Sequence, residues 1–526
     1  MWCRLATCGR LAIGLFTVPL WSADALILDR SHESNVFPET RRYRIFLPPS
    51  YEKSALRYPV IYWFHGYGER SNLGPPSKAY DRGTDYNGDN LANFVATHDV
   101  IIVKWDGENA PSSRPYNIGP VETDRQFPLY FPELVAHIDA TYRTIPDREH
   151  RATAGLSMGG FMSFWIAGKY PDLVSSASSF MGSPEFVVGP RAFPVEYSHD
   201  VMSANYAGVR TRLITGSQDF IQFYHRQMNL FWRIPAHETE NFDSDHGVPA
   251  LAKTLEFHMN AFANPLPRPE SWSHVDIYPN FKVWDWTVES DRRQPGFTSI
   301  HGASRTGFVS SVQEWIPGGK LLPDVHLTIT TGPIYRKNAR IQVITRTQSS
   351  NRRQHLKTDP SGRLHIALNG GFSLIVIGKT PRNQRFPDLG FETAALQPLT
   401  TDFQIADHRT FDVFQHAVEK QPLTLGEGNA DGQADPGEQI AILFPDSGAY
   451  RAAELFSSDA CLDLTTRISD NWATYDHVGA SAKYTLAKIS KTCPANHVMT
   501  LRARVLFPNK PNHQPREFTI ELPITH

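Results

Sequence analysis

The 526-residue sequence is poor in cysteine, and this scarcity excludes several kinds of site. It has 4 cysteines, two near the N-terminus and two, Cys461 and Cys493, near the C-terminus. No C-x-x-C pair and no cluster of cysteine with histidine occurs, so the sequence gives no support for a zinc site. In an exported chain, Cys461 and Cys493 most simply form one disulfide in the C-terminal region.

An excess of charge of either sign is also lacking. Lys+Arg 52 and Asp+Glu 54 leave a formal net charge of -2, which gives no electrostatic basis for binding nucleic acid or an anionic membrane. Hydrophobic residues at 40% and aromatic residues at 12% are sufficient for packed cores, so disorder is not expected. The length predicts two or three domains.

Long apolar runs are absent except near the N-terminus. The run 11–21 follows two arginines and precedes Ala23-Asp24-Ala25, a pattern typical of a signal-peptide cleavage site. The run is too short to cross a bilayer comfortably. We therefore expect residues 1–25 to be a signal peptide, the mature chain to be secreted or periplasmic, and no membrane span to remain after cleavage. The alternative is a buried N-terminal strand or an anchor.

The most informative stretch that is present is a serine turn. Residues 155–159, Gly-Leu-Ser-Met-Gly, match G-x-S-x-G, the strand-to-helix turn that exposes a nucleophilic serine. A short strand is predicted before it at 151–154, and apolar residues recur at helical spacing after it. A Cβ on either glycine would strike the neighbouring strand and helix. The alternative is a glycine-rich turn with an incidental serine, but strand, turn and helix together favour Ser157 as a nucleophile.

Strands and helices alternate through the first half of the chain. The apolar runs 60–64 and 100–105 predict strands buried on both faces, and 131–142 has the spacing of an amphipathic helix. Loops rich in glycine, proline and asparagine follow the strands. This order predicts an α/β fold, a mostly parallel sheet with helices on both faces, which binds ligands at the carboxyl ends of its strands.

A serine nucleophile needs a base, and the base needs an acid to orient it. A predicted strand at 212–216 ends in a turn that carries Asp219, and the turn 241–247 carries His246. The order Ser157, Asp219, His246 is that of the α/β-hydrolases. Asp219 as a turn or capping residue and His246 as a solvated loop residue remain alternatives. The rival acids are Asp200, Asp243 and Asp245.

Acyl transfer also requires two backbone N–H groups that point at the developing oxyanion. One is expected from Met158, the residue after the nucleophile. The other is expected from the loop after strand 60–64, with Tyr67 as its donor. His65 precedes the serine in the chain, and we expect it to brace this loop or to have a plain structural role.

Several motifs together resemble one family. They are Arg44-Ile-Phe-Leu-Pro-Pro, Val60-Ile-Tyr-Trp-Phe-His-Gly, Ala154-Gly-Leu-Ser-Met-Gly-Gly, Gly216-Ser-Gln-Asp and Asp245-His-Gly. They are similar to the “Putative esterase” family of α/β-hydrolases, which includes feruloyl esterases, S-formylglutathione hydrolase and the mycolyltransferases. The resemblance covers about half of the chain.

The resemblance implies an α/β-hydrolase fold without a catalytic cofactor. It assigns Ser157 as nucleophile, Asp219 as orienting acid, His246 as base, and Tyr67 and Met158 as oxyanion donors. Two departures from the family pattern occur. The loop 65–69 has fewer glycines than many relatives, and Gly247-Val248-Pro249 stands where relatives often have an aromatic residue.

The second half of the chain has a different sequence pattern. The segment 264–269 contains three prolines and marks a boundary that no helix or central strand crosses. Beyond it, short alternating runs separated by turns predict all-β, sandwich-like domains. We expect an esterase domain at 26–265, a β-rich domain at 272–380 and an Ig-like β-sandwich at 388–526. Five aromatic residues are expected in a core rather than on a carbohydrate-binding platform: Trp272, Tyr278, Trp284, Trp286 and Trp315.

One turn in the last domain is rich in hard oxygen ligands. Asn429, Asp431, Asp435 and Glu438 offer the donors that calcium takes in proteins. The turn is similar to those that open Ig-like β-domains of exported bacterial proteins. It predicts a structural calcium site, with an Asx-rich turn without metal as the alternative.

Together these patterns predict an exported serine carboxylic-ester hydrolase that works through an acyl-enzyme. The expected partner is an ester substrate, with feruloyl or acetyl esters of polysaccharide favoured. One alternative is an acyltransferase to a sugar or lipid acceptor. Another is a non-catalytic carbohydrate-binding or adhesion protein whose hydrolase domain is inert.

Overall fold

A computed structural model describes most of the chain. The described residues are 24–37, 40–66, 69, 80–82, 85–107, 127–182, 185–188, 195–219, 236–314, 321–347, 349–378, 404–415, 419–445, 452–464, 468–469, 471–474, 481–506 and 516–524. Residues 1–23 of the predicted signal peptide, Tyr67 and Trp315 lie outside these ranges. Among the described residues, no helix is long and apolar enough to span a membrane.

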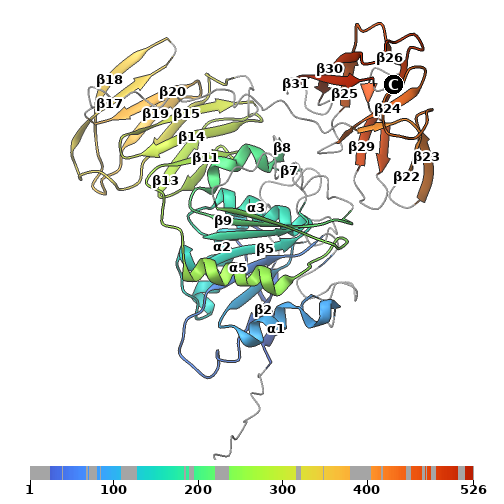
Figure 1. The fold of residues 1–526 in the computed structure, drawn as a ribbon. Helices are drawn as coiled ribbons and strands as arrows, with labels where there is room; N and C mark the ends of the chain where they lie inside the picture. The colour runs from blue at the N-terminus through green and yellow to red at the C-terminus, as the bar shows by residue number, and fades with distance from the viewer. Residues whose placement is uncertain are drawn as a thin grey trace, which may run out of the picture.

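The first half of the chain forms one eight-stranded sheet in the order β1-β2-β4-β3-β5-β6-β9-β10 (Figure 1). The strands are β1 (Leu26–His32), β2 (Arg41–Leu47), β3 (Val60–Phe64), β4 (Ile101–Trp105), β5 (Arg151–Leu156), β6 (Ser176–Phe180), β9 (Arg210–Gly216) and β10 (His237–Phe242). β1 and β2 run antiparallel to their neighbours, and every pair from β4 to β10 is parallel.

Four α-helices flank this sheet in the described residues: α1 (Leu91–Thr97), α2 (Phe127–Thr141), α3 (Met158–Lys169) and α5 (Leu251–Ala263). Successive side chains of β3 point to opposite faces of the sheet and show which helices cover each face. Tyr62 and Phe64 share an apolar cluster with α2 and α3, whereas Ile61 and Trp63 share a separate one with α1 and α5. The sheet is therefore covered on both faces. This is the α/β-hydrolase fold that the sequence predicts.

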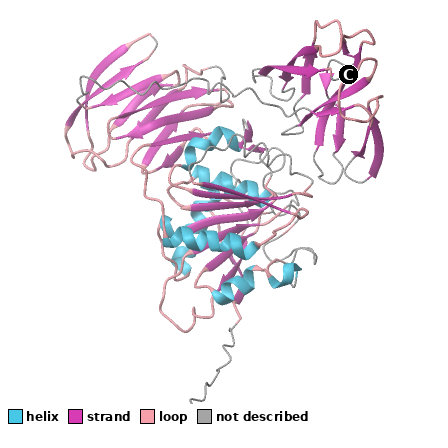
Figure 2. Ribbon diagram, viewed as in Figure 1, coloured by secondary structure: helices cyan, strands magenta, loops and turns pink. Residues whose placement is uncertain are grey.

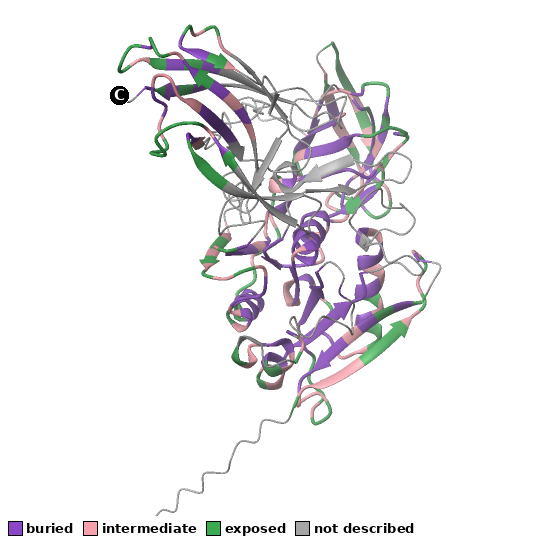
Figure 3. Cartoon of the chain, turned by 90° about the vertical axis from the view of Figure 1, so that its right-hand side faces the viewer, coloured by how far each residue is buried: buried purple, intermediate pink, exposed green. Residues whose placement is uncertain are grey.

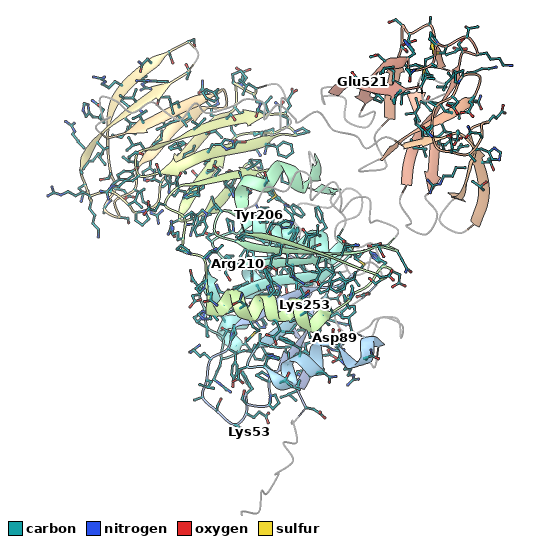
Figure 4. All side chains as sticks on the ribbon, viewed as in Figure 1. Lys53, Asp89, Tyr206, Arg210, Lys253 and Glu521 are labelled. Atoms are coloured by element: carbon teal, nitrogen blue, oxygen red, sulfur yellow. A yellow bond between two sulfur atoms is a disulfide. The ribbon has the colours of Figure 1, made fainter. Side chains whose placement is uncertain are left out.

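The helix pair on the second face is also joined by a polar contact. Asp89, labelled in Figure 4, precedes α1, and its carboxylate accepts a hydrogen bond from the backbone N–H of Ala252 at 2.7 Å. Shorter elements complete this half: 3-10 turns at Asp85–Gly88, Arg148–His150 and His199–Tyr206, and the hairpin of β7 (Glu185–Val188) with β8 (Val195–Ser198).

Past α5 the described chain consists of strands and loops (Figure 2). Two antiparallel sheets come first. One has the order β11-β14-β15-β20-β17-β18, with bounds Trp272–Asp276, Phe297–Ser304, Gly307–Gln313, Ser373–Ile377, Arg340–Arg346 and Asn351–Lys357. The other has the order β12-β13-β16-β19, with bounds Phe281–Val283, Trp286–Ser290, His326–Thr330 and His365–Asn369.

The inner faces of these two sheets enclose one apolar cluster, as in a β-sandwich. Trp272, Trp284 and Trp286 belong to it and are at most 4% exposed, and Tyr278 is equally buried in the hydrolase cluster. These four aromatic residues are therefore core residues, as expected, and form no platform for a sugar.

The last part of the chain is a second β-structure with its own core. Its strands are β21 (Gln404–Ala406), β22 (Arg409–Gln415), β23 (Glu419–Leu425), β24 (Gln439–Pro445), β25 (Ala452–Phe456), β26 (Leu462–Leu464), β27 (Ile468–Ser469), β28 (Asn471–Thr474), β29 (Ser481–Ile489), β30 (Val498–Leu506) and β31 (Arg516–Pro523). The predicted disulfide between Cys461 and Cys493 is present. The two cysteines are 32 residues apart in the sequence.

The hydrolase and the first β-sandwich share buried residues. Val275, Ile277, Tyr278 and Phe297 belong to the same apolar cluster as α2 and α3. Every residue of β5 and of α3 is buried, and Figure 3 shows purple, buried helices and strands packed together. The proline-rich segment thus marks a change of secondary structure, while the hydrolase cluster continues past it through these four residues.

Candidate active site

Ser157 lies at the turn between β5 and α3, in the backbone geometry that the motif predicts. Its φ of 57° and ψ of -117° are rare for a residue with a side chain, because Cβ crowds the backbone there. The N–H of Ser157 donates to the carbonyl of Phe180 at 2.8 Å, and its own carbonyl starts the helix by accepting from Phe161. The hydroxyl makes no capping bond to the helix. It remains available for chemistry.

The two motif glycines are required by contacts with β3 and α3. A Cβ on Gly155 would lie 2.4 Å from the carbonyl oxygen of Gly159 and 2.6 Å from that of Phe64. A Cβ on Gly159 would lie 2.0 Å from the Phe64 carbonyl oxygen and 2.7 Å from that of His65. These contacts bring the start of α3 directly against the end of β3. The two places expected to supply oxyanion donors therefore adjoin.

His246 and Asp219 meet although 27 residues separate them. The distance from His246 Nδ1 to Asp219 Oδ1 is 2.9 Å, with the carboxylate fully buried and the imidazole 12% exposed. Because a carboxylate only accepts, Nδ1 carries the proton and Nε2 is left as an acceptor. This is the tautomer that a general base requires.

Met181 connects this pair to the serine turn. It follows Phe180, whose carbonyl holds the Ser157 N–H, and its own N–H donates to the carbonyl of Ile214 in β9. The Met181 sulfur lies 3.0 Å from the N–H of Gly247, the residue after His246. Ser157, Asp219 and His246 therefore sit at the same carboxyl edge of β5, β6 and β9.

The rival acids have other surroundings. Asp243 is exposed, and its carboxylate accepts hydrogen bonds from Ser217 at 2.9 Å and from Gln218 at 2.8 Å. These two bonds hold the pKa of Asp243 below its ordinary value and brace the turn that carries Asp219. The side chain of Asp200 lies outside the described residues, and Asp245 directly precedes His246 in the chain.

His65 is a fully buried clamp between two loops. Its Nδ1 lies 2.8 Å from the carbonyl oxygen of Gly66, and its Nε2 lies 2.7 Å from the N–H of Gly107 after β4. A carbonyl accepts and an amide donates, so the ring is neutral with its proton on Nδ1. Burial lowers the pKa of His65 and favours this neutral form. His65 thus braces the loop after β3, one of the two roles expected for it.

Of the two expected oxyanion donors, Met158 is the first residue of α3 and is 2% exposed. Tyr67 lies outside the described residues. The positive end of the α3 dipole points toward the same edge of the sheet.

Two residues near the site could not be identified from the sequence. Met181 lies in a stretch without a motif, and nothing in the sequence marks it. Glu69 closes the His-Gly loop, and its burial at 2% exposure gives the first sign that it matters. Its only distinguishing feature in the sequence is its position shortly after the end of β3.

The acidic turn at 428–438 collects the four residues named from the sequence, and a fifth, Asp407, joins them. The side-chain amide of Asn429 donates to Asp435 at 2.9 Å, and Glu438 accepts from the N–H of Asn429 at 2.9 Å. Asp407 accepts from the N–H groups of Asp431 and Gly432. These carboxylates thus order the turn directly. A calcium role for them stays a prediction.

Residues 34–248 match the model of the family described as “Putative esterase”. The chain is 34% identical over 141 residues to Esterase Rv1288 of Mycobacterium tuberculosis, which covers 26% of this chain and 28% of that protein. It is 27% identical over 157 residues to an endo-1,4-beta-xylanase/feruloyl esterase of Xylanibacter ruminicola, over 28% of this chain and 21% of the relative. The chain thus spans less than a third of these relatives' length.

Some solved structures also align with part of the chain. A ferulic acid esterase aligns with 46% of this chain and 99% of its own, at 19% identity and a TM-score of 0.37. An S-formylglutathione hydrolase from Staphylococcus aureus covers 46% of this chain and 100% of its own, at 13% identity and a TM-score of 0.35. The family model over residues 34–248 confirms the resemblance that the sequence motifs indicate.

Proposed function

We propose that this chain is an exported serine carboxylic-ester hydrolase with Ser157, His246 and Asp219 as its catalytic residues. The observation that carries the proposal is the geometry of one sheet edge. There, a serine in a strained turn makes no capping bond, and a buried carboxylate holds a histidine in the tautomer of a base. The family match over residues 34–248 supports ester chemistry.

The reaction follows from these positions. Nε2 of His246 takes the proton of the Ser157 hydroxyl as the oxygen attacks the ester carbonyl carbon. The N–H of Met158, a second N–H from the loop after β3 and the α3 dipole stabilise the oxyanion. The imidazolium, stabilised by Asp219, then gives its proton to the departing alcohol. Water, deprotonated by His246, attacks the acyl-enzyme, and Ser157 leaves with the proton.

The proposed substrates are feruloyl or acetyl esters of polysaccharide. Support comes from the feruloyl esterase named among the relatives and from the β-domains that follow the hydrolase. An acyltransferase would share every step up to the acyl-enzyme and differ in the nucleophile that resolves it. Turnover in water with and without added sugar alcohols separates the two, because a transferase yields a new ester in proportion to the added acceptor.

Hydrolysis of p-nitrophenyl acetate by wild type, Ser157→Ala and Asp243→Asn tests the proposal. Loss of a triad member costs about 10⁴-fold or more in kcat, so Ser157→Ala is expected to lose nearly all activity. Asp243→Asn removes the rival carboxylate but keeps a side-chain oxygen that can accept from Ser217 and Gln218, so its activity is expected to stay within about threefold of wild type. Equal rates for wild type and Ser157→Ala would refute the proposal and favour an inert hydrolase domain.

A further inference from the structure

The hairpin of β17 and β18 carries a concentration of positive charge that the overall balance of the chain hides. From residue 325 to 358 the sequence has seven Lys and Arg residues and no Asp or Glu, although the formal net charge of the whole chain is -2. All seven basic side chains are exposed: Arg336, Lys337, Arg340, Arg346, Arg352, Arg353 and Lys357. The hairpin therefore presents positive charge of one sign to solvent.

The packing of the hairpin shows which of these side chains share a face. Val343 belongs to the apolar cluster of the sandwich and Leu356 packs against that cluster, so both point inward. Side chains alternate along a strand, and Arg340, Arg353 and Lys357 lie an odd number of residues from these positions. These three therefore point outward together, and we call this surface the basic face.

The basic face brings like charges together without an acidic partner. Arg340 and Lys357 are directly opposed in the β17–β18 pairing, an arrangement that destabilises a sheet. No side chain of the basic face forms an ion pair with a described residue. Asp359, the next acid along the chain, accepts hydrogen bonds from the backbone N–H groups of Ser361 and Arg363. An anionic ligand would relieve the repulsion that the fold leaves uncompensated.

The position of the hairpin separates it from the proposed catalytic residues. β18 is the edge strand of its sheet, and β11, at the opposite edge, packs on the hydrolase (Figure 1). Five strand spacings, roughly 24 Å, lie between these edges. Charges on an edge strand also prevent association between sheets, but charges of either sign do so. Protection of the edge therefore does not explain why every charge here is positive.

The composition of the hairpin favours one class of anionic partner. Guanidinium groups bind carboxylates through paired, charge-assisted hydrogen bonds. Neither strand has a phenylalanine, tyrosine or tryptophan on which nucleic-acid bases could stack. Adsorption to a membrane uses exposed apolar side chains, and the large ones among the described residues, Leu56 and Val498, lie outside the hairpin. A polymer with carboxylates at regular intervals fits an extended basic face.

We propose that the basic face of the β17–β18 hairpin binds an acidic polysaccharide, one that carries carboxylate groups along its chain. The bound polymer holds the hydrolase near esters on the same polysaccharide. Binding depends on the hairpin alone, whereas the statement that the polymer carries the hydrolysed esters rests on the proposed function.

Calorimetric titration with polygalacturonate tests the binding. The full chain carries Ser157→Ala, so that no ester is cleaved. Arg353→Glu/Lys357→Glu reverses two charges of the basic face, and the matched control Lys282→Glu/Arg293→Glu reverses two exposed charges elsewhere in the same sandwich. We expect the first pair to weaken binding by about 10-fold or more, because both attractions become repulsions, and the control to stay within about twofold.

The stability of the same variants separates a binding role from a structural one. Lys357→Glu places opposite charges across the strand pair from Arg340, so the Tm of Arg353→Glu/Lys357→Glu is expected to equal or exceed that of wild type. The edge strand also stays charged, so solubility is expected to be unchanged. Added salt should weaken the binding of polygalacturonate to wild type, because the contacts are exposed to solvent.

Three results would overturn the inference. The first is an equal affinity of wild type and Arg353→Glu/Lys357→Glu for polygalacturonate. The second is an equal loss in Lys282→Glu/Arg293→Glu, which would mean that only the overall charge matters. The third is tighter binding of double-stranded DNA or of phosphatidylglycerol vesicles than of polygalacturonate, which would assign the basic face to another partner.

Kinetics with Ser157 intact connect the basic face to the reaction. With acetylated polygalacturonate, Arg353→Glu/Lys357→Glu is expected to raise KM and leave kcat unchanged, and with p-nitrophenyl acetate to change neither. An unchanged KM for the polymer would show that the face does not deliver substrate. A protein that binds polygalacturonate and hydrolyses neither ester would defeat the proposed function and leave the binding site standing. Ester hydrolysis without polymer binding would do the reverse.

Discussion

At the scale of single residues, some polar side chains lie buried in the hydrolase core and are paired there by hydrogen bonds. His258 of α5 is fully buried between two serines of β6: its Nδ1 lies 2.8 Å from the Ser176 hydroxyl and its Nε2 lies 2.8 Å from that of Ser178. A neutral imidazole satisfies both, because a hydroxyl can donate or accept. Burial, with the nearby Arg212 charge as a smaller cause, lowers the pKa of His258 to about 3.

This pKa makes the hydrolase sensitive to acid. The imidazole of an unfolded chain has a pKa near 6.5. Between about pH 6.5 and 3, the unfolded chain therefore binds a proton at this histidine that the folded protein does not bind. The contribution of the neutral His258 to the free energy of unfolding is fully present above pH 6.5 and is lost as the pH falls through this window. His258→Gln is expected to reduce the slope of unfolding free energy against pH by about 1.4 kcal/mol per unit there.

Urea unfolding followed between pH 4 and 8 measures that slope. The matched control is His355→Asn, which alters an exposed histidine of β18 and should leave the slope unchanged. An identical slope in wild type and His258→Gln would show that the imidazole does not stay neutral in the folded protein.

At the scale of elements, α3 has a function at each end. Its first residue supplies a proposed oxyanion N–H, and its last residue, Lys169, pairs with Asp276 of β11 at 2.6 Å, with both side chains at most 4% exposed. Burial raises the pKa of Asp276, but Lys169 and His274 outweigh it and hold that pKa below its ordinary value. The side chain of Asn205 adds bonds to the carbonyls of Gly168 and Val275. The helix is thus fixed to the first β-sandwich.

Removing one partner of this ion pair leaves the charge of the other buried in the core and unpaired. Asp276→Leu alone is expected to destabilise the protein by about 3–5 kcal/mol. The double variant Lys169→Met/Asp276→Leu should recover most of that loss, because no charge remains buried. Chemical denaturation of the two single variants and the double variant gives the coupling energy. Additive losses would show that the pair is not coupled across the junction.

The sequence predicts elements well where one period dominates. β3 has its expected bounds because a continuous apolar run marks it. α2 begins at Phe127, four residues before the predicted start, and contains Pro132. Proline lacks the N–H that would bond to the Pro128 carbonyl, and the Tyr170 hydroxyl donates to that carbonyl at 2.7 Å instead. A distant side chain thus permits a helix that local rules end.

Other elements depend on partners far along the chain. β6 reads as Ser-Ala-Ser-Ser-Phe and carries no apolar period, because two of its hydroxyls pair with His258 of α5. The G-x-S-x-G turn, the acid and the histidine could be named from local motifs and chain order. Glu69 and Met181 could not, since their roles come from contacts with Tyr80 and Gly247 that no spacing encodes.

At the scale of the whole molecule, residues at the start of the first β-sandwich pack into the apolar cluster of the hydrolase, although the sandwich also has a cluster of its own. Val275, Ile277, Tyr278 and Phe297 all pack in the cluster that includes Phe161 of α3. Cutting the chain at the proline-rich segment would expose that surface to water, at a cost of roughly 25 cal/mol for each Å². The three-part division at 26–265, 272–380 and 388–526 stays a prediction, and the shared core makes its first boundary the most informative to test.

Two truncations test it. A chain of residues 24–380 is expected to be soluble and to hydrolyse p-nitrophenyl acetate at a rate near that of the full chain. A chain of residues 24–268 is expected to aggregate or to melt at a much lower Tm, because the β11 residues that cover α3 are gone. If the shorter chain matches the longer one in Tm and activity, the β-sandwich is a separable addition and the shared core contributes little.

The central claim is that Ser157 is an activated nucleophile. Labelling with a fluorophosphonate, followed by mass spectrometry of the digested protein, measures this directly, because only a serine with a working base reacts quickly. We predict a single modified peptide that contains Ser157, and strongly slowed labelling in His246→Ala. Labelling at another residue, or labelling that persists unchanged in His246→Ala, would contradict the account.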